Sequence, residues 1–350
     1  MLSQGQSRRI VLAGMLAAPA LLVRKARAAD PLRIRIQGVG ATFTALTEIY
    51  ARSLGLYEQH GLAAEYLPPI YNANGIMQVV VQGTADIAST GGSSIIQAVQ
   101  QGRRVKCIGV GMLGLELKVS LTKPGQEKVS KLGITTASPP MERVRALRGL
   151  RLAAPGTGST SDTAFRYSLK RAGIDPTRDV IIQPMGDAGS MLAAARAGAV
   201  DALVGVAATA NGRAEAEGTA TRFIAFEEDD AVLQNYPTTI MAVTDEFLQK
   251  NQEAVRRFLA SMHDARKAIR RGLTEAELTT MKQKFFPDMS DANWTTSLRQ
   301  TIPQFSGSLT PVRAQYDALM LTNNAQAEVP ATVTFEQCFD PSLAAVVEKG

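Results

Sequence analysis

Apolar and polar residues alternate in short runs along the chain, and each run is followed by helical periodicity. Residues 32–36 alternate in this way, which predicts a strand with one buried face. Residues 38–40 break the pattern with two glycines, and residues 43–54 then have the spacing of an amphipathic helix that ends at Gly55. We therefore expect a strand, a loop and a helix in succession.

The same unit recurs before residue 118. Further strands are expected at residues 62–67, 85–89 and 105–110, with one helix at residues 74–82 and another that ends before Gly102. A second series of strands is expected at residues 117–121, 150–154, 180–182 and 200–204, with helices at residues 162–172 and 191–196. Residues 123–140 are polar and contain prolines and glycines, which predicts a surface loop.

The chain then returns to an apolar strand at residues 238–243 and a long amphipathic helix at residues 251–271. Strands that alternate with helices predict an α/β fold with mainly parallel sheets, which bind ligands at the carboxyl ends of their strands. The length exceeds the roughly 250–300 residues at which one core stops growing. We therefore expect two lobes, the first formed by residues 29–117 and 237–350 and the second by residues 118–236.

The first 28 residues have the pattern of an export signal. Arg8 and Arg9 precede an apolar run at residues 10–23, and residues 26–28 read Ala-Arg-Ala, a small-x-small cleavage site. The run is shorter than the roughly 20 residues that cross a bilayer. The arginine pair favours the twin-arginine export route, and an ordinary secretory signal is the alternative.

Most of the net charge belongs to this segment. The chain has a formal charge of +6, and five basic residues with no acidic residue lie in the first 28 positions. Without them the chain has 33 basic residues against 32 acidic ones. A nearly neutral mature protein without a basic stripe does not predict a nucleic-acid partner.

Residues for covalent or metal chemistry are scarce. The two histidines, His60 and His263, lack a second histidine or cysteine at metal-ligand spacing, and Cys107 lies within an apolar strand. We therefore expect no catalytic residue, no metal and no cofactor. Cys107 and Cys338 are interpreted as buried free thiols, with a disulfide between them as the alternative.

Two glycine- and hydroxyl-rich loops join a strand to the start of a helix. Their candidate binding residues are Thr90, Gly91, Gly92 and Ser93 in the first loop and Thr157, Gly158, Ser159 and Thr160 in the second. Helix starts present unpaired backbone N–H groups and the positive end of the helix dipole, which suits an oxyanion. Simple capping of each helix by Ser or Thr is the alternative.

Further candidates follow other predicted strands. They are Gly40, Thr42 and Phe43, then Tyr71 and Asn72, then Met185 and Asp187. Phe43 and Tyr71 could enclose an apolar part of the ligand, although an aromatic residue that opens a helix is more often part of the core. Asp187 would favour an amine or hydroxyl on the ligand, or it caps the next helix.

Several segments resemble a known family in the order in which they occur. "ARSLGLYEQHGLAAEYLP", "GIMQVVVQGTADIASTGGSS", "LRGLRLAAPGTGST" and "MGDAGSMLAAARAGAVDALVG" resemble segments of the NMT1/THI5-like and sulfonate/nitrate/taurine-type periplasmic binding proteins, including SsuA-like proteins. The resemblance covers residues 32–271. The chain departs from the family at residues 206–211, which lack the proline that often follows this strand.

The resemblance implies a periplasmic binding protein of type II fold, with two lobes, a ligand cleft between them and two crossover hinge segments. It implies a monomer in the periplasm that captures a small organic anion or zwitterion, such as a sulfonate, taurine, nitrate or a carboxylate. The implied partner is an ABC transporter permease with its ATPase, through which alone the protein meets the membrane. A thiamine-precursor or desulfinase-like enzyme and a periplasmic ligand sensor are the alternatives on the same fold.

Overall fold

The structure is a computed structural model that describes residues 30–70, 72–157, 159–185, 187–206, 210–305, 307–325, 327 and 329–350. The predicted export signal and the candidate residues Tyr71 and Gly158 lie outside the described residues. Residues 31–350 form one compact unit. None of the helices within the described ranges combines the length and apolar composition needed to cross a membrane.

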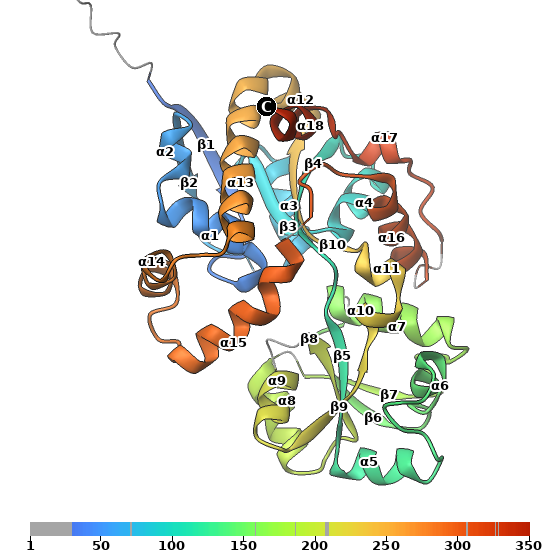
Figure 1. The fold of residues 1–350 in the computed structure, drawn as a ribbon. Helices are drawn as coiled ribbons and strands as arrows, with labels where there is room; N and C mark the ends of the chain where they lie inside the picture. Colours follow the sequence, from blue (N-terminus) through green and yellow to red (C-terminus); the bar gives the residue numbers. More distant parts are fainter. Residues whose placement is uncertain are drawn as a thin grey trace, which may run out of the picture. The chain divides into compact units, whose positions relative to one another are not determined.

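The first sheet has five strands in the order β2-β1-β3-β10-β4 (Figure 1). Their bounds are β1 Leu32–Gln37, β2 Leu62–Tyr66, β3 Ile87–Gly91, β4 Val105–Leu113 and β10 Pro237–Thr244. Strand β1 pairs in parallel with β2 and β3, and β10 is antiparallel to both β3 and β4. Strand β10, the last strand of this sheet along the chain, thus lies between β3 and β4, which occur much earlier in the sequence.

The second sheet has the order β7-β6-β8-β5-β9. Its strands are β5 Leu117–Thr122, β6 Arg151–Ala154, β7 Ile181–Pro184, β8 Ala202–Val206 and β9 Ala220–Ala225. Strand β6 is parallel to β7 and β8, and β5 is antiparallel to β8 and β9. The two sheets and their helices form the two α/β lobes that the sequence predicts.

Both sheets are mixed, so the expectation of mainly parallel sheets is only partly correct. The chain leaves the first sheet at β4 and enters the second directly at β5 through residues 114–116. It returns through residues 226–236 and enters the first sheet at β10. Parallel neighbours need a crossover connection within one sheet, and a strand that arrives from the other lobe is free of this requirement.

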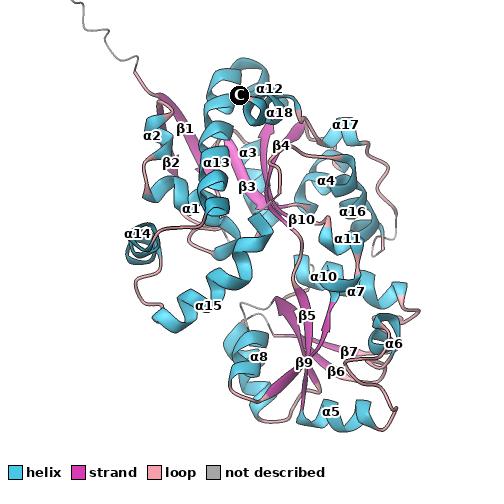
Figure 2. Cartoon of the chain, in the orientation of Figure 1, coloured by secondary structure: helices cyan, strands magenta, loops and turns pink. Residues whose placement is uncertain are grey.

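Helices cover both sheets (Figure 2). Those of the first lobe are η1 Phe43–Ala45, α1 Leu46–Ser53, α2 Leu56–Gln59, α3 Ala73–Val81, α4 Ser93–Gln100, α12 Asp245–Lys250, α13 Gln252–Arg271, α14 Glu275–Phe285, α15 Asp291–Thr301, η2 Ile302–Phe305, α16 Arg313–Asn324, α17 Phe335–Cys338 and α18 Ser342–Lys349. Those of the second lobe and the return connection are α5 Lys123–Ser130, α6 Pro140–Arg145, α7 Thr160–Arg171, α8 Ala188–Arg196, α9 Ala210–Ala216, α10 Phe226–Asp229 and α11 Ala231–Gln234.

Helix α13 confirms the long amphipathic helix expected from the sequence. Phe258, Leu259 and Met262 on its inner face are fully buried in the core of the first lobe. Glu253 on its outer face pairs with Arg256 and Arg257 at 2.8 and 2.7 Å. The helix is therefore held mainly by burial of one face, since exposed ion pairs of this kind contribute little.

The prediction of a surface loop at residues 123–140 is wrong for the first part of this segment, because residues Lys123–Ser130 form helix α5. Pro124 lies in the first turn of α5, where the missing N–H has no intrahelical partner to lose. A Cβ at Gly125 would lie 1.9 Å from the carbonyl oxygen of Asp201, so only glycine allows this helix to pack so closely. The proline and glycine that indicated a loop therefore serve helix entry and close packing.

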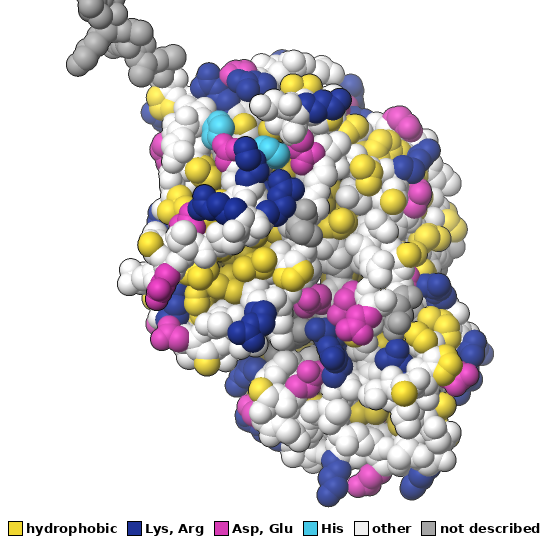
Figure 3. All heavy atoms as spheres, viewed as in Figure 1, with side chains coloured by type: hydrophobic (Ala, Val, Ile, Leu, Met, Phe, Trp, Pro, Cys, Tyr) yellow, Lys and Arg dark blue, Asp and Glu magenta, His cyan; other side chains and the backbone are white. Residues whose placement is uncertain are grey.

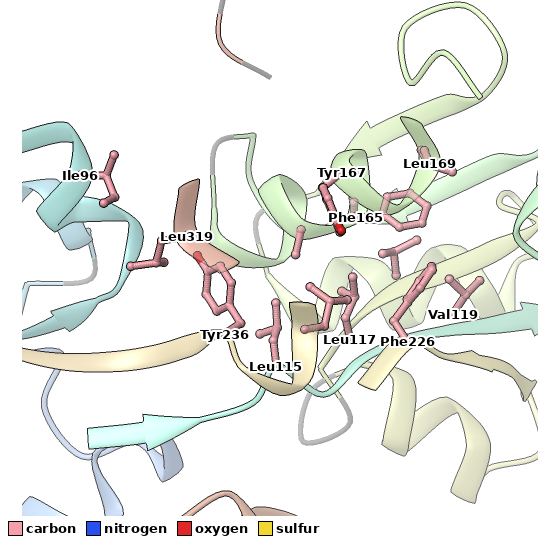
Figure 4. Packing of buried hydrophobic residues seen from close by; sticks show 14 of the residues in the cluster. Ile96, Leu115, Leu117, Val119, Phe165, Tyr167, Leu169, Phe226, Tyr236 and Leu319 are labelled. Atoms are coloured by element: carbon pink, nitrogen blue, oxygen red, sulfur yellow. The ribbon is translucent and has the colours of Figure 1, made fainter. Parts of the chain in front are cut away.

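One apolar cluster includes buried residues of both lobes. Leu115 comes from the outgoing connection, Leu117 from the start of β5 and Tyr236 from the return connection, while Phe165 comes from α7 and Leu319 from α16 (Figure 4). All five side chains are at most 2% exposed. The connections between the lobes are thus embedded in a common core.

Candidate functional site

The two glycine-rich loops meet in the structure. Gly91 ends β3 in the first lobe and Thr160 begins α7 in the second. A Cβ built on Gly91 would lie 3.4 Å from Thr160 Oγ1, which is ordinary van der Waals contact. The starts of α4 and α7 therefore lie on facing parts of the two lobes, as the binding interpretation requires.

The side chains of the described residues leave the start of α4 uncapped. Its N-cap is Gly92, and a Cβ there would lie 2.2 Å from the carbonyl oxygen of Pro237, so a glycine is needed for the close approach of β10. Thr90 is buried and donates to the carbonyl oxygen of Ala73 at 3.0 Å. The N–H of Ile95 donates to the carbonyl oxygen of Gly92 at 3.3 Å. Since no described side chain caps the helix, the N–H groups before Ile95 are candidates to bind another acceptor.

The start of α7 is capped conventionally. The Ser159 hydroxyl accepts a hydrogen bond from the N–H of Asp162 at 3.2 Å, so for Ser159 the capping interpretation is correct. Thr160 follows as the first helical residue and is half-buried, and Thr157 is exposed. Thr160 is thus the residue of this loop that the structure brings to the first lobe.

Tyr236 lies beside both helix starts, and the sequence analysis missed it. Its side chain is fully buried, and its hydroxyl makes no hydrogen bond with any described residue. Burial raises the pKa of Tyr236 to about 12, and the nearby hydroxyls of Ser93 and Thr160 offset this in part. No local pattern marks this residue, because it comes from the return connection, far along the chain from either loop.

The loop after β1 is held against the loop after β2. Gln37 is buried, and its side-chain amide donates to the carbonyl oxygen of Pro68 at 2.8 Å. Gly40 has a φ of 81°, in the left-handed region that favours glycine, and the N–H of Thr42 donates to its carbonyl oxygen at 3.0 Å. Gly40 and Thr42 therefore form a tight turn at the carboxyl end of β1.

Phe43 is half-buried and packs against the core of the first lobe. Its ring stacks on Phe286 with centroids 5.0 Å apart and lies 5.6 Å from the ring of Trp294. The alternative interpretation, that an aromatic residue at a helix start packs in the core, describes Phe43 correctly. The ring of Phe43, which was predicted to enclose an apolar part of the ligand, thus packs against two aromatic residues of its own lobe.

Asn72 and Asp187 act as helix caps. Asn72 is exposed, and its side chain accepts from the N–H of Gly75 at 2.9 Å at the start of α3. Asp187 accepts from the N–H and the hydroxyl of Ser190 at 2.9 and 2.6 Å, and these bonds lower its pKa. Met185 packs partly buried against the core of the second lobe. The capping alternative thus describes both polar residues.

A buried carboxyl group lies behind the first loop. Glu48 of α1 accepts hydrogen bonds from the hydroxyls of Ser89 and Tyr66, and Tyr66 in turn bonds to the hydroxyl of Tyr57 at 2.6 Å. Burial raises the pKa of Glu48, and the bonds from Ser89 and Tyr66 offset this in part. The carboxyl group is thus satisfied within the lobe, one layer behind the residues that face the second lobe.

A cavity of about 320 Å³ opens beside the two connections, and residues of both lobes line it. Lys118 lies 3.9 Å from Glu116 and 3.8 Å from Glu227. Burial raises the pKa of Glu227 to about 7 and also raises that of Glu116, against the charge of Lys118. Figure 3 shows acidic side chains gathered over α10 at this place.

A second, smaller cavity of about 150 Å³ lies between α5 and β9, and none of the predicted site residues lines it.

The cysteines and histidines occupy other places. Cys107 and Cys338 are free and buried, and burial raises the pKa of both thiols, that of Cys338 to about 12. His60 pairs with Asp264 at 2.8 Å on the outside of the first lobe. No group of three or more potential metal ligands occurs among the described residues.

Several solved structures resemble this one. The periplasmic aliphatic sulphonate binding protein SsuA from Escherichia coli matches with a TM-score of 0.66 and 17% identity, over 90% of this chain and 99% of its own. A ligand-binding component of an ABC-type import system from Staphylococcus aureus matches with a TM-score of 0.67 and 14% identity, over 91% and 100%. The nitrate-binding protein NrtA from Synechocystis matches with a TM-score of 0.59 and 13% identity, over 91% and 86%.

At these identities the likenesses establish the fold, which is that of the periplasmic binding proteins with two α/β lobes. A search of curated protein sequences found no match. The family model described as NMT1/THI5 like matches residues 43–272, which is more than half of the chain. Its match spans both glycine-rich loops and both connections between the lobes. The chain therefore belongs to the NMT1/THI5-like family.

Proposed function

We propose that this protein is the solute-binding component of an ABC-type importer and captures a small organic anion or zwitterion. The observation that carries the proposal is the approach of Gly91 to Thr160, which places the starts of α4 and α7 on facing parts of the two lobes. Neither loop contains a lysine or arginine. Backbone N–H groups, hydroxyls and helix dipoles would therefore hold the anion.

In this proposal binding is coupled to hinge closure. Residues 29–117 with 237–350 would move against residues 118–236 about the connections at residues 114–116 and 226–236. A ligand that contacts both helix starts is held fully only when the lobes are closed, so it favours the closed state. The closed state would then present both lobes together to the permease and its ATPase.

We also propose export to the periplasm through the signal at residues 1–28, with Arg8 and Arg9 directing the twin-arginine route. This agrees with the periplasmic relatives SsuA and NrtA, and with a mature protein that is nearly neutral. The protein would act as a monomer, since one chain supplies both facing helix starts.

A ligand panel tests the proposed binding function. Residues 29–350 would be melted with and without methanesulfonate, taurine, nitrate, acetate and benzoate, with an amine and a neutral sugar as controls. A true ligand raises the melting temperature in proportion to ln(1 + [L]/Kd). We expect at least one anion to do so and neither control to respond. A response to none of the anions would contradict the proposal.

The enzyme alternative needs an activated nucleophile or base near the helix starts. The two thiols are buried with raised pKa values, and His60 is engaged with Asp264. These observations favour binding over desulfinase-like chemistry. Recovery of the responding ligand unchanged after prolonged incubation with the protein would agree with binding, whereas its turnover would contradict it.

A further inference from the structure

We propose that the hydroxyl of Tyr236 donates a hydrogen bond to the bound anion, and that Tyr236 is thus a third binding element beside the starts of α4 and α7. The inference rests on the proposed function and names a residue that determines which ligands fit. It assigns the site to ligands with an oxyanion head, such as a sulfonate or carboxylate. A ligand whose bound end carries only hydrogen-bond donors would leave the phenol unsatisfied.

The hydroxyl of Tyr236 is buried without a partner in the described part of the chain. Tyr236 is 0% exposed, and its oxygen is buried without a hydrogen-bond partner among the described residues. Buried hydroxyls are nearly always hydrogen-bonded, because an unmade bond costs the full desolvation of the group. The unpaired hydroxyl of Tyr236 is explained if the bound ligand supplies the hydrogen-bond acceptor.

The hydroxyl of Tyr236 lies close to the first residues of both helices. Ser93 and Thr160 are the first residues of α4 and α7, and their hydroxyls lie close enough to the phenol oxygen to lower its pKa. Neither hydroxyl makes a hydrogen bond of normal geometry with that oxygen. Both residues are half-buried and therefore reach solvent. An acceptor between the two helix starts would lie within reach of the Tyr236 oxygen.

Buried apolar side chains hold the ring of Tyr236 in place. It lies between Leu115 of the outgoing connection and Leu319 of α16, both buried (Figure 4). Packed apolar neighbours fix the direction of the hydroxyl before any ligand arrives, so that little side-chain entropy is lost on binding. The pKa near 12 keeps the phenol protonated and a donor at every pH the protein would meet.

Tyr236→Phe tests the inference because it removes only the oxygen. We expect the variant to bind the best anion of the panel about tenfold to a hundredfold more weakly, the usual loss for a hydrogen bond to a charged group. We expect its melting temperature without ligand to stay the same or to rise, since an unsatisfied buried hydroxyl is removed.

Tyr316→Phe is the matched control. Tyr316 is a buried tyrosine of α16 whose hydroxyl donates to the carbonyl oxygen of Val333. This variant should melt at a lower temperature than the parent and bind the anion with unchanged affinity. The two variants thus separate a hydroxyl that serves the fold from one that serves the ligand.

Two outcomes would overturn the inference. A lower melting temperature of unliganded Tyr236→Phe would mean that the hydroxyl is already satisfied by Ser93 or Thr160. Unchanged anion affinity of this variant would mean that it does not reach the ligand. A parent that responds to no anion would instead contradict the proposed function, and the melting temperatures without ligand would still test the state of the hydroxyl.

Discussion

Adjacent glycines in the first loop have different roles that only their surroundings reveal. A Cβ at Gly91 would meet Ala73 and Thr160 at ordinary contact distance, whereas a Cβ at Gly92 would overlap the carbonyl oxygen of Pro237. In the sequence the two residues are equivalent, and both were interpreted as binding residues. In the structure Gly91 faces the second lobe, and Gly92 allows β10 to approach the start of α4.

The two glycines should therefore respond differently to substitution. Gly92→Ala should lower the free energy of unfolding by about 1–3 kcal/mol, the usual cost of forcing extra atoms into packed structure. Gly91→Val should weaken the response to the anion, because its methyl groups would push Thr160 away. It should cost less stability than Gly92→Ala, because the atoms displaced belong to a half-buried side chain rather than to the backbone of β10. Urea unfolding and the thermal-shift panel measure the two effects. If Gly91→Val responds to the anion like the parent, the approach of the two loops has no part in binding.

At the scale of elements, the sequence located the strands and helices near the first loop well and those near the lobe connections less well. Three strands begin where their patterns predict, at residues 32, 62 and 105. The long helix α13 also lies where it was expected. Strand β9 and helices α9 to α11 were not predicted, and the start of residues 123–140 was wrongly expected to be a loop. Short elements at the connections take their shape from contacts between the lobes, which leave no period in the sequence.

The connections also contain the group with the clearest pH dependence. Burial raises the pKa of Glu227 to about 7 from an ordinary value of 4.5. The folded state therefore binds a proton that the unfolded state releases between these pH values, and stability falls as pH rises through this window. At higher pH the folded state must hold the buried carboxylate in its charged form.

Glu227→Gln should remove this dependence. Its melting temperature should be close to that of the parent near pH 4.5, should exceed it increasingly as the pH rises from 4.5 to about 7, and should exceed it by a constant amount at higher pH. Glu228→Gln is the control, because this neighbouring side chain is 62% exposed. Melting curves at a series of pH values measure the difference. Parallel curves for the parent and Glu227→Gln would show that this carboxyl group does not govern the stability of the hinge.

For the whole molecule, the shared core implies that the lobes unfold together. One buried cluster contains Leu115 of the outgoing connection, Leu117 and Phe165 of the second lobe, and Leu319 of α16. Helix α16 comes late in the sequence and packs against α7 of the second lobe as well as α4 of the first. Calorimetry should therefore find one unfolding transition for residues 31–350.

A pair of leucines on α16 tests this coupling. Leu319 is 0% exposed and Leu321 is 51% exposed. Leu319→Ala should lower the free energy of unfolding of the single transition by about 2–5 kcal/mol, whereas Leu321→Ala should change it by less than about 0.5 kcal/mol. Two separate transitions, with only one of them sensitive to Leu319→Ala, would mean that the lobes fold independently.

The sequence by itself determined the class of fold, the family and the two glycine-rich helix starts, because periodicity and local motifs are properties of neighbouring residues. Only the tertiary structure decided that Gly91 meets Thr160 and that Phe43 packs against Phe286 and Trp294. It alone brought Tyr236 to the helix starts and Glu227 to Lys118. These pairs are far apart along the chain, so their proximity depends on how the connections fold back, and this leaves no local signal.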